Sequence, residues 1–330
     1  MPLSCLRLAF AFNLHRLVVA VTAVAAAMPA AATEPLFEFD AANTVIGGAE
    51  IVETVYEDTL LDIGRKYGLG YEEITLANPA VDPWVPGDGT AVRLPTQFVL
   101  PDAARKGLVI NIAEYRMYFF YRRDDANWVE TFPISIGRMD WNTPLGRSSV
   151  VSKVYKPTWY PPASVREEWA ADGRTLASQV PPGPDNPLGD YALRLSIPGY
   201  LIHGTNRPAG VGMRVTHGCV RMFPEDIEFL YPKVDVNTPV QIVNQPFKMG
   251  WLGDDLYLEV HRPLDEDGDE QSSSLTAITQ LYVRATRERA ARIDWQLAES
   301  VYREQLGIPV RVGKAVVDAV AQQDVDLSRQ

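Results

Sequence analysis

The sequence predicts a mainly β protein in which a strand-rich central domain lies between a small α/β module and a helical extension. Between residues 106 and 244, short β-branched and aromatic runs alternate with turn residues, which is typical of sandwiches and barrels. The 25 prolines among 330 residues also favour strands and loops over a helical bundle. From residue 278 to 301, apolar residues recur instead at roughly helical spacing. We therefore expect a β-sandwich-like sheet arrangement with one or two short helices at one edge.

Residues 1–32 have the features of a secretory signal peptide. An uncharged apolar run at 17–27 follows two arginines, and the alanines at 30–32 offer a cleavage site. An uncleaved membrane anchor is the alternative, but the run is shorter than the roughly 20 residues that span a bilayer. We favour cleavage, which removes Cys5 and leaves the mature chain in an oxidising compartment.

The chain is acidic, with 42 Asp and Glu residues against 31 Lys and Arg residues. Loss of the signal peptide, which holds two arginines and no acidic residue, changes the formal net charge from −11 to −13. A strongly acidic protein repels nucleic acid and anionic membrane surfaces. We therefore exclude nucleic acid as a partner.

The first module, residues 51–97, follows the order strand, helix, helix, strand. The expected strands are 51–56 and 91–95, and the expected helices are 59–67 and 71–77. This order resembles a LysM module, which binds peptidoglycan sugars. The residues that carry the resemblance are 57–60, Ile63, Tyr67, 78–79, 89–90 and 94–95. The alternative interpretation is a structural cap that packs on the next domain.

A hairpin opens the central domain, with strands at 108–112 and 116–121 on either side of a short turn. Further strands are expected at 129–136, 149–154, 191–196, 200–203 and 240–243. A helix is expected over 224–231, because Pro224 and the acidic residues after it suit a helix N-terminus.

Residues 245–330 are expected to form a linker and a helical C-terminal extension. The acidic stretch 265–270 has its glycine misplaced for a calcium-binding loop, so we interpret it as a solvated linker. The helical stripe that follows carries paired acids and arginines on its other face, and we assign no chemistry to it.

Cys219 is the only cysteine that remains after signal cleavage, so it cannot form a disulfide within the mature chain. A free cysteine is often a small buried apolar residue, and the alternative is a reactive thiol. His203 and His217 lie within the same seventeen residues. An imidazole takes up a thiol proton near neutral pH and can later pass it to a leaving amine.

The spacing of these residues favours the reactive thiol. His203 ends an expected strand, and the glycine-rich loop 208–212 allows the chain to double back toward Cys219. Gly218 permits a tight turn, in which successive backbone N–H groups can hold an oxyanion. We therefore predict that Cys219 is a nucleophile.

Two segments carry a resemblance to a known family. Residues 203–205 (His-Gly-Thr) and 216–221 (Thr-His-Gly-Cys-Val-Arg) resemble the signature of the L,D-transpeptidase (YkuD) family. The resemblance covers residues 106–244 and implies a YkuD-like β-sandwich with a short helix by the active site. It includes three segments familiar from the Gram-negative periplasmic branch, namely 142–146, 157–162 and 186–189. That branch also often carries a LysM-like N-terminus.

The resemblance implies roles for the catalytic residues. Cys219 would be the nucleophile, and His203 would be the general base and acid. The backbone carbonyl of Gly204 would orient His203, and N–H groups around Gly218 and Cys219 would stabilise the tetrahedral oxygen. No cofactor is implied, and the few histidines and the single mature thiol show no metal-binding spacing.

Three further residues would bind the substrate or shape its site. His217 would line the site, and Thr216 fits the small hydroxyl position before it. The forked guanidinium of Arg221 would pair with a substrate carboxylate.

The donor of this family is a peptidoglycan tetrapeptide stem. The resemblance implies that Cys219 attacks the carbonyl of the third-position diamino acid, releases D-alanine and forms an acyl-enzyme. An amine of another stem would give a cross-link between two third-position residues, and a lipoprotein lysine would anchor the lipoprotein. Alternatives are an L,D-carboxypeptidase or hydrolase that uses water, or a non-catalytic peptidoglycan-binding envelope protein. The expected location is the periplasm.

Overall fold

The computed structural model describes residues 36–40, 42–138, 141–264 and 275–316. In this part the protein is mainly β, as expected, with six α-helices. The predicted signal peptide at 1–32 and the acidic stretch at 265–270 lie outside the described residues. None of the described helices combines the length and the apolar character that a membrane span requires.

The first module has the expected order of strand, helix, helix and strand. Its elements are β3 (Glu50–Glu53), α1 (Leu60–Lys66), α2 (Tyr71–Ala77) and β4 (Ala91–Leu94), and β3 pairs antiparallel with β4. The hydroxyl of Thr59 caps α1 by accepting a hydrogen bond from the N–H of Asp62. Leu60 and Ile74 are buried in a cluster that also contains Tyr118 of the central domain, so the module packs on that domain.

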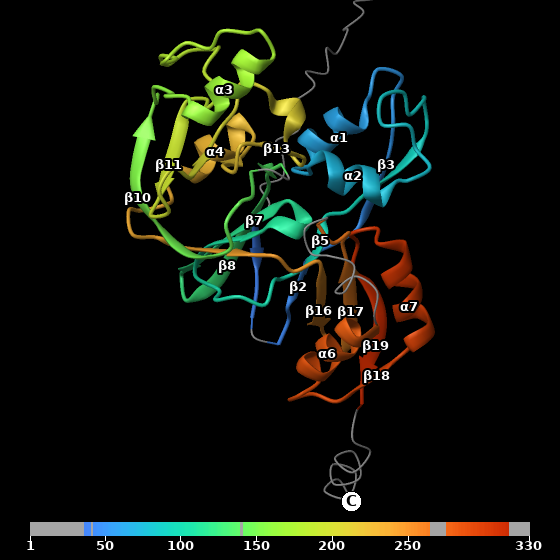
Figure 1. Ribbon diagram of the computed structural model, residues 1–330. Helices are drawn as coiled ribbons and strands as arrows, with labels where there is room; N and C mark the ends of the chain where they lie inside the picture. Colours follow the sequence, from blue (N-terminus) through green and yellow to red (C-terminus); the bar gives the residue numbers. More distant parts are fainter. Residues whose placement is uncertain (1–35, 41, 139–140, 265–274, 317–330) are drawn as a thin grey trace, which may run out of the picture. The chain divides into compact units, whose positions relative to one another are not determined.

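A nine-stranded mixed sheet forms most of the central domain (Figure 1). Its strand order is β1-β8-β7-β6-β15-β10-β11-β12-β14. The pairs β6–β15 and β12–β14 are parallel, and the other neighbours in the order are antiparallel. The strands are β1 (Leu36–Glu38), β6 (Gly107–Asn111), β7 (Arg116–Arg123), β8 (Ala126–Pro133), β10 (Gly146–Tyr155), β11 (Tyr191–Leu195), β12 (Leu201–His203), β14 (Val220–Arg221) and β15 (Pro239–Val243).

The long strand β10 changes its partner halfway along. Its first residues pair with β15, the rest pair with β11, and the register with β11 shifts between Val150 and Ser152. Such a shift bends a strand. Leu108 of β6 and Leu193 of β11 are buried in one hydrophobic cluster, although they belong to opposite halves of the sheet. The two halves therefore enclose a common core as in the expected sandwich, while the hydrogen bonding continues through β10.

Short elements complete the N-terminal and central parts. They are β2 (Val45–Gly47), β5 (Gln97–Val99), η1 (Ile112–Glu114), β9 (Ile136–Gly137), α3 (Ala163–Ala171), η2 (Pro208–Gly210), β13 (Arg214–Thr216) and α4 (Pro224–Leu230). Strand β2 pairs with β5, and β9 pairs with β13. Helix α4 begins at Pro224, as predicted, whereas α3 was not predicted.

The C-terminal part corrects the expected helical extension, because it contains a four-stranded antiparallel sheet in the order β16-β17-β19-β18. Its elements are β16 (Phe247–Leu252), β17 (Asp255–Val260), α6 (Leu275–Ala285), β18 (Ala291–Ile293), α7 (Trp295–Glu304) and β19 (Val310–Ala315). The apolar stripe at 278–301, which we assigned to helix, runs through α6, β18 and α7. At the start of β16 the buried residues are Lys248 and Gly250, which a pattern of apolar residues does not identify as a strand.

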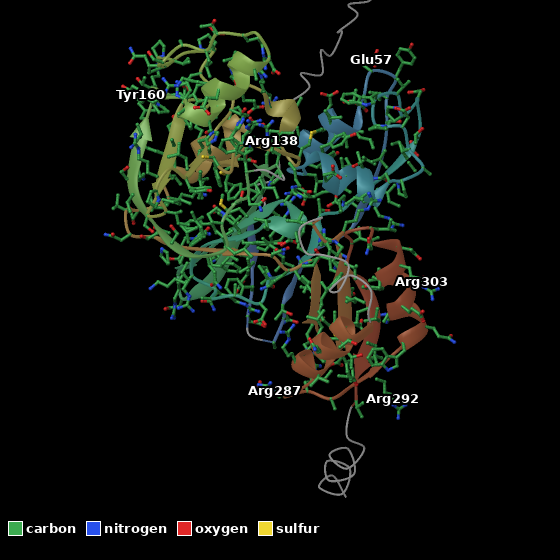
Figure 2. All side chains as sticks on the ribbon, in the orientation of Figure 1. Glu57, Arg138, Tyr160, Arg287, Arg292 and Arg303 are labelled. Atoms are coloured by element: carbon green, nitrogen blue, oxygen red, sulfur yellow. The ribbon has the colours of Figure 1, made fainter. Side chains whose placement is uncertain are left out.

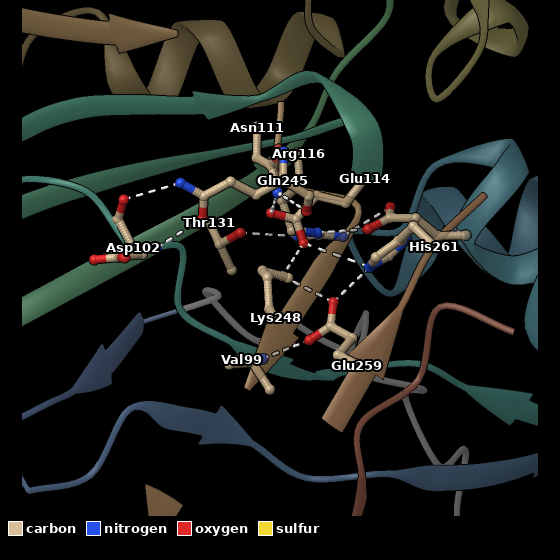
Figure 3. A network of polar contacts seen from close by, with 11 residues as sticks. Val99, Asp102, Asn111, Glu114, Arg116, Thr131, Gln245, Lys248, Glu259 and His261 are labelled. Carbon is tan, nitrogen blue, oxygen red and sulfur yellow. Dashed lines mark hydrogen bonds and ion pairs between the residues drawn. The ribbon is translucent and has the colours of Figure 1, made fainter. Parts of the chain in front are cut away.

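A buried ionic network connects the C-terminal sheet to the central domain (Figure 3). The ammonium of Lys248 on β16 donates to Glu114 of η1 and lies 2.8 Å from a carboxylate oxygen of Glu259 on β17. The other oxygen of Glu259 accepts from the N–H of Val99 at 2.6 Å, and His261 Nε2 lies 2.5 Å from the first oxygen. Because all four charged or titratable side chains are buried and paired, the network fixes these segments to one another.

Candidate active site

The structure places His203 at the end of one strand and Cys219 just before the neighbouring strand. His203 ends β12, and Cys219 immediately precedes β14. The two strands pair in parallel, with Ile202 opposite Val220 and His203 opposite Arg221. This pairing brings the imidazole-bearing and thiol-bearing residues to one edge of the sheet.

Contacts to backbone carbonyls fix the turn that leads to Cys219. The hydroxyl of Thr216 donates to the Cys219 carbonyl at 2.6 Å, and the hydroxyl of Thr143 donates to the Gly218 carbonyl at 2.9 Å. Gly218 has a φ of +96°, and a Cβ there would lie 2.8 Å from Cε1 of Tyr200, so this position requires glycine. Thr216 is only 2% exposed, so its hydroxyl supports the turn instead of facing a substrate.

One hydrogen bond orients the ring of His203. Its Nδ1 lies 2.6 Å from the carbonyl oxygen of Gly204, so Nδ1 carries the proton and donates it. The other ring nitrogen, Nε2, is then the one that can accept a proton. Burial, followed by the positive charge of Arg221, lowers the pKa of His203 to about 4. The imidazole is therefore neutral at neutral pH and can act as a base.

The thiol of Cys219 is also neutral at rest. Burial raises the pKa of the Cys219 thiol, and the nearby backbone of Leu201 and the charge of Arg221 offset this only in part. Its Sγ faces the carbonyl of Gly199 at 3.7 Å. A thiol that is neutral at rest is not a preformed thiolate, so it needs a base to remove its proton before it can attack.

Arg221 supplies a partly buried positive charge that acts on both His203 and Cys219. Its Nε is buried and has no hydrogen-bond partner among the described residues. Burial and the neighbouring charge of Arg207 lower the pKa of the Arg221 guanidinium. A buried donor atom without a partner is costly, and an anion that accepts from it removes that cost. Arg221 therefore has an unused donor near Cys219.

His217 makes a contact that sequence reasoning missed. Its Nε2 lies 2.8 Å from a carboxylate oxygen of Glu168 on α3, and Arg138 donates to the same oxygen. The ring of Trp141 meets the His217 ring edge-on, with centroids 5.1 Å apart. Neither α3 nor its carboxylate belongs to a recognisable motif, and no pattern in the sequence links residue 168 to residue 217.

The first module touches the loop that connects His203 to Cys219. The N–H groups of Tyr71 and Glu72, at the start of α2, donate to the carbonyls of Val211 and Gly212 at 3.1 and 3.3 Å. Gly70 and Gly212 approach so closely that a Cβ on Gly70 would lie 2.6 Å from the Cα of Gly212. The module therefore supports the catalytic loop directly.

Two ion pairs connect the first module to other elements of the central domain. Arg65 of α1 donates from two nitrogens to Glu225 of α4, at 2.7 and 2.9 Å. Arg116 of β7 makes a buried two-nitrogen contact with Glu73 of α2. Bidentate guanidinium–carboxylate pairs fix orientation as well as distance.

One group of side chains away from Cys219 has the composition of a metal site. The potential ligand atoms of Glu114, Glu259 and His261 all lie within 4.8 Å of one another. The ammonium of Lys248, however, contacts both carboxylates and so already supplies the positive charge between them. The arrangement fits a self-neutralised ionic network better than a metal centre.

Comparison with known proteins identifies the catalytic region. Residues 105–242 match the family described as YkuD, the L,D-transpeptidase catalytic domain. The probable L,D-transpeptidase YcfS of Escherichia coli K12 is 39% identical over 298 residues, which cover 88% of this chain and 91% of that protein. The probable L,D-transpeptidase ErfK/SrfK of Salmonella typhimurium LT2 is 37% identical over 256 residues, covering 77% and 82%.

Solved structures with partial likeness carry the same family name. A crystal structure of an L,D-transpeptidase from Mycobacterium tuberculosis H37Rv has 20% identity and a TM-score of 0.30, and the match covers 48% of this chain and 63% of that one. The catalytic domain of the Enterococcus faecium L,D-transpeptidase has 20% identity and a TM-score of 0.32, with 43% and 99% covered. The assignment rests on the sequence matches. By these, the chain belongs to the L,D-transpeptidase family, whose members are acyl-transferring enzymes.

Proposed function

We propose that the chain is a peptidoglycan L,D-transpeptidase in which Cys219 forms an acyl-enzyme with the third-position diamino acid of a tetrapeptide stem. The observation that carries this proposal is the parallel pairing of β12 and β14, which sets His203 beside the strand that follows Cys219. The hydrogen bond from His203 Nδ1 to Gly204 leaves Nε2 ready to take the thiol proton.

The reaction begins when His203 removes the proton from Cys219 and the sulfur attacks the carbonyl carbon. Backbone N–H groups around Gly218 hold the tetrahedral oxygen. The imidazolium then gives its proton to the amine of D-alanine as the carbon–nitrogen bond breaks, leaving a thioester on Cys219. An acceptor amine loses a proton to His203, attacks the thioester and releases the thiol.

Substrate binding uses the positive charge beside the thiol. The unused donor of Arg221 supports pairing with a stem carboxylate, and Arg207 adds charge nearby. This local charge offsets the acidic character of the whole chain, so an anionic stem peptide is attracted to the site. His217 lines the site through its ring, whereas Thr216 acts within the turn.

The acceptor decides the product, and the same acyl-enzyme serves each acceptor. Another stem gives a cross-link, a lipoprotein lysine gives an anchored lipoprotein, and water gives carboxypeptidase activity. We favour an amine acceptor. Mass spectrometry of muropeptides from cells with and without the gene distinguishes these products, and a change confined to shortened stems would contradict transpeptidation.

The first assay measures D-alanine release from a tetrapeptide muropeptide by the purified mature protein. Cys219→Ala should lower the rate by more than about a thousandfold, because the nucleophile is removed. The wild-type protein should show the mass of a covalent stem adduct, and the variant should show none. Unchanged thermal unfolding of the variant serves as the control for folding. A Cys219→Ala protein with full activity would overturn the proposal.

A second candidate function is peptidoglycan binding by the first module without catalysis. Two aromatic side chains of this LysM-like unit, Tyr56 and Trp84, are 82% and 59% exposed, and exposed aromatic rings are suited to stacking on sugars. The Cys219→Ala protein should sediment with purified sacculi. Sedimentation combined with no turnover by the wild-type protein would favour this second function.

We also propose that residues 1–32 direct export to the periplasm, where the substrate lies. The two arginines and the apolar run support this proposal. A chain that lacks these residues should stay in the cytoplasmic fraction of cells, and its recovery from the periplasm would contradict the proposal.

A further inference from the structure

A chain excursion lies next to the catalytic strands. Residues 156–190 connect β10 to β11, and Ala192 of β11 pairs with His203. The excursion closes on itself through two backbone hydrogen bonds between Trp159 and Val180, at 2.9 and 2.8 Å. Tyr160, at its outer edge in Figure 2, is 64% exposed. The two sides of this excursion are therefore held together by its own backbone hydrogen bonds.

Helix α3 lies within this excursion and has little apolar contact with the rest of the protein. Val165 is its one buried residue. Because one small apolar side chain contributes only about 1.5–3 kcal/mol on full burial, packing alone holds the helix weakly. Its polar contact with the active site is accordingly important for its position.

That contact is made by Glu168. One of its carboxylate oxygens accepts from Arg138 and from Nε2–H of His217 at 2.8 Å, and the two donors lie 3.2 Å apart. The side chains of Glu168, Arg138 and His217 are 35%, 38% and 31% exposed. The hydrogen bonds from Arg138 and then His217 lower the pKa of Glu168 to about 2, so the carboxylate stays charged well below neutral pH.

The contact of Glu168 with His217 lies two residues before the nucleophile Cys219 in the chain. His217 directly precedes Gly218 and Cys219, and its ring contacts both Glu168 and Trp141. The same carboxylate therefore fixes a side chain of the Cys219 turn and holds α3 beside that turn. A carboxylate so acidic, with its accepting oxygen occupied, is unsuited to act as a general base.

We propose that Glu168 is a positioning residue that clamps α3 to the Cys219 turn and so forms one wall of the donor site. This inference rests on the proposed function, because it assigns the wall to the site that binds the stem peptide. Its role is to reduce the freedom of α3 before the donor binds, which favours binding. Glu168 acts on binding of the donor, whereas His203 and Cys219 carry the chemistry.

The test compares Glu168→Gln with Glu167→Gln, a neighbouring exposed acid on the same helix. Glu168→Gln should raise the KM for D-alanine release from a tetrapeptide about three- to tenfold, because a partly exposed charged contact is lost, and should change kcat less than about twofold. Glu167→Gln should match the wild-type protein. Equal KM values for the wild-type and Glu168→Gln proteins would overturn the proposal.

A double variant separates a clamp from general destabilisation. Arg138→Gln combined with Glu168→Gln should raise KM no more than Glu168→Gln alone, because both changes remove the same contact between Arg138 and Glu168. Additive effects would contradict the clamp. Alkylation of Cys219 by iodoacetamide without donor should not slow in Glu168→Gln, because the thiol and His203 are untouched. A parallel loss of alkylation and kcat would also overturn the proposal.

A final measurement does not depend on turnover. Amide hydrogen exchange over residues 163–171 should be faster in Glu168→Gln than in Glu167→Gln, because α3 is released from the turn. If the wild-type protein releases no D-alanine, the proposed function fails while this measurement still tests the clamp. Unchanged exchange with normal turnover would instead overturn the clamp alone.

Discussion

At the scale of single residues, the electrostatics of His203, Cys219 and Arg221 suit a general base that removes the thiol proton only when the substrate is attacked. Burial keeps both the imidazole and the thiol neutral, since each charged form is poorly solvated. The charge of Arg221 lowers the pKa of His203 and favours the thiolate of Cys219 at the same time. We therefore expect the thiolate of Cys219 and the imidazolium of His203 to form only during attack, when the negative charge passes from the sulfur to the substrate oxygen.

The pH dependence of the free enzyme follows from the lowered pKa of His203. Activity should fall as the pH drops through about 4, because the protonated ring cannot accept the thiol proton. Arg221→Gln should move the pKa of His203 upward, since a nearby positive charge no longer opposes protonation. The pKa of His203 should still remain below the ordinary histidine value, because burial lowers it more than the charge of Arg221 does. Histidine ring signals followed by NMR over a pH titration measure both values.

The acid limb of kcat/KM provides an independent check of this prediction. In Arg221→Gln the limb should shift to higher pH along with the NMR value. Arg166→Gln, a change at an exposed arginine of α3, should leave the limb where it is. A downward or absent shift in Arg221→Gln would show that the guanidinium does not act on the ring.

At the scale of elements, the start of α2 and the loop before Cys219 meet through two glycines. Hydrogen bonds from Tyr71 and Glu72 to the loop carbonyls require close approach of the two backbones. That approach leaves no room for a Cβ between Gly70 and Gly212. The module therefore acts on the catalytic loop whether or not it binds glycan.

Gly70→Ala should destabilise the protein by about 1–3 kcal/mol, because the added methyl group overlaps the Gly212 backbone. D-alanine release should also slow, since the displaced loop leads to Cys219. Gly48→Ala is the matched control, because a Cβ at that position meets nothing within 4 Å. Urea unfolding and the release assay measure the two effects. Equal stability of the two variants would contradict a close approach between the backbones of Gly70 and Gly212.

At the scale of the whole molecule, the buried ionic network ties the C-terminal sheet to the central domain (Figure 3). Burial raises the pKa of Glu114. Burial also opposes the charge of Glu259, but Lys248 and His261 outweigh it and lower that pKa to about 2. One ammonium thus balances carboxylates from two segments far apart in the chain, so the segments depend on each other for stability.

Lys248→Met should cost about 3–5 kcal/mol of unfolding free energy at neutral pH, because two carboxylates lose their buried counter-ion. The loss should shrink toward acid pH, since Glu114 then takes up a proton and its buried charge disappears. Arg303→Gln removes an exposed pair with Glu299 and should cost less than about 0.5 kcal/mol. Urea unfolding at neutral and mildly acidic pH tests the comparison, and similar losses in both variants would contradict it.

Sequence patterns predicted the helices and strands that are determined by residues close together in the chain. The helix expected at 59–67, the proline at the start of α4 and the strands of the central sheet all lie close to their predicted positions. The C-terminal sheet was missed, because a helical stripe and short, largely buried strands have ambiguous periods. Helix α3 was missed since its apolar face is minimal and its main contact is a distant polar one.

The sequence by itself determined the family, and it predicted the thiol and imidazole of the proposed mechanism, because these depend on residue types and spacing within one short segment. Only the tertiary structure decided that Glu168 meets His217, that α2 rests on the loop before Cys219 and that Lys248 lies between Glu114 and Glu259. Each of these contacts joins residues far apart in the chain, where the energies depend on distance and burial. Neither quantity is encoded in a local pattern of amino acids.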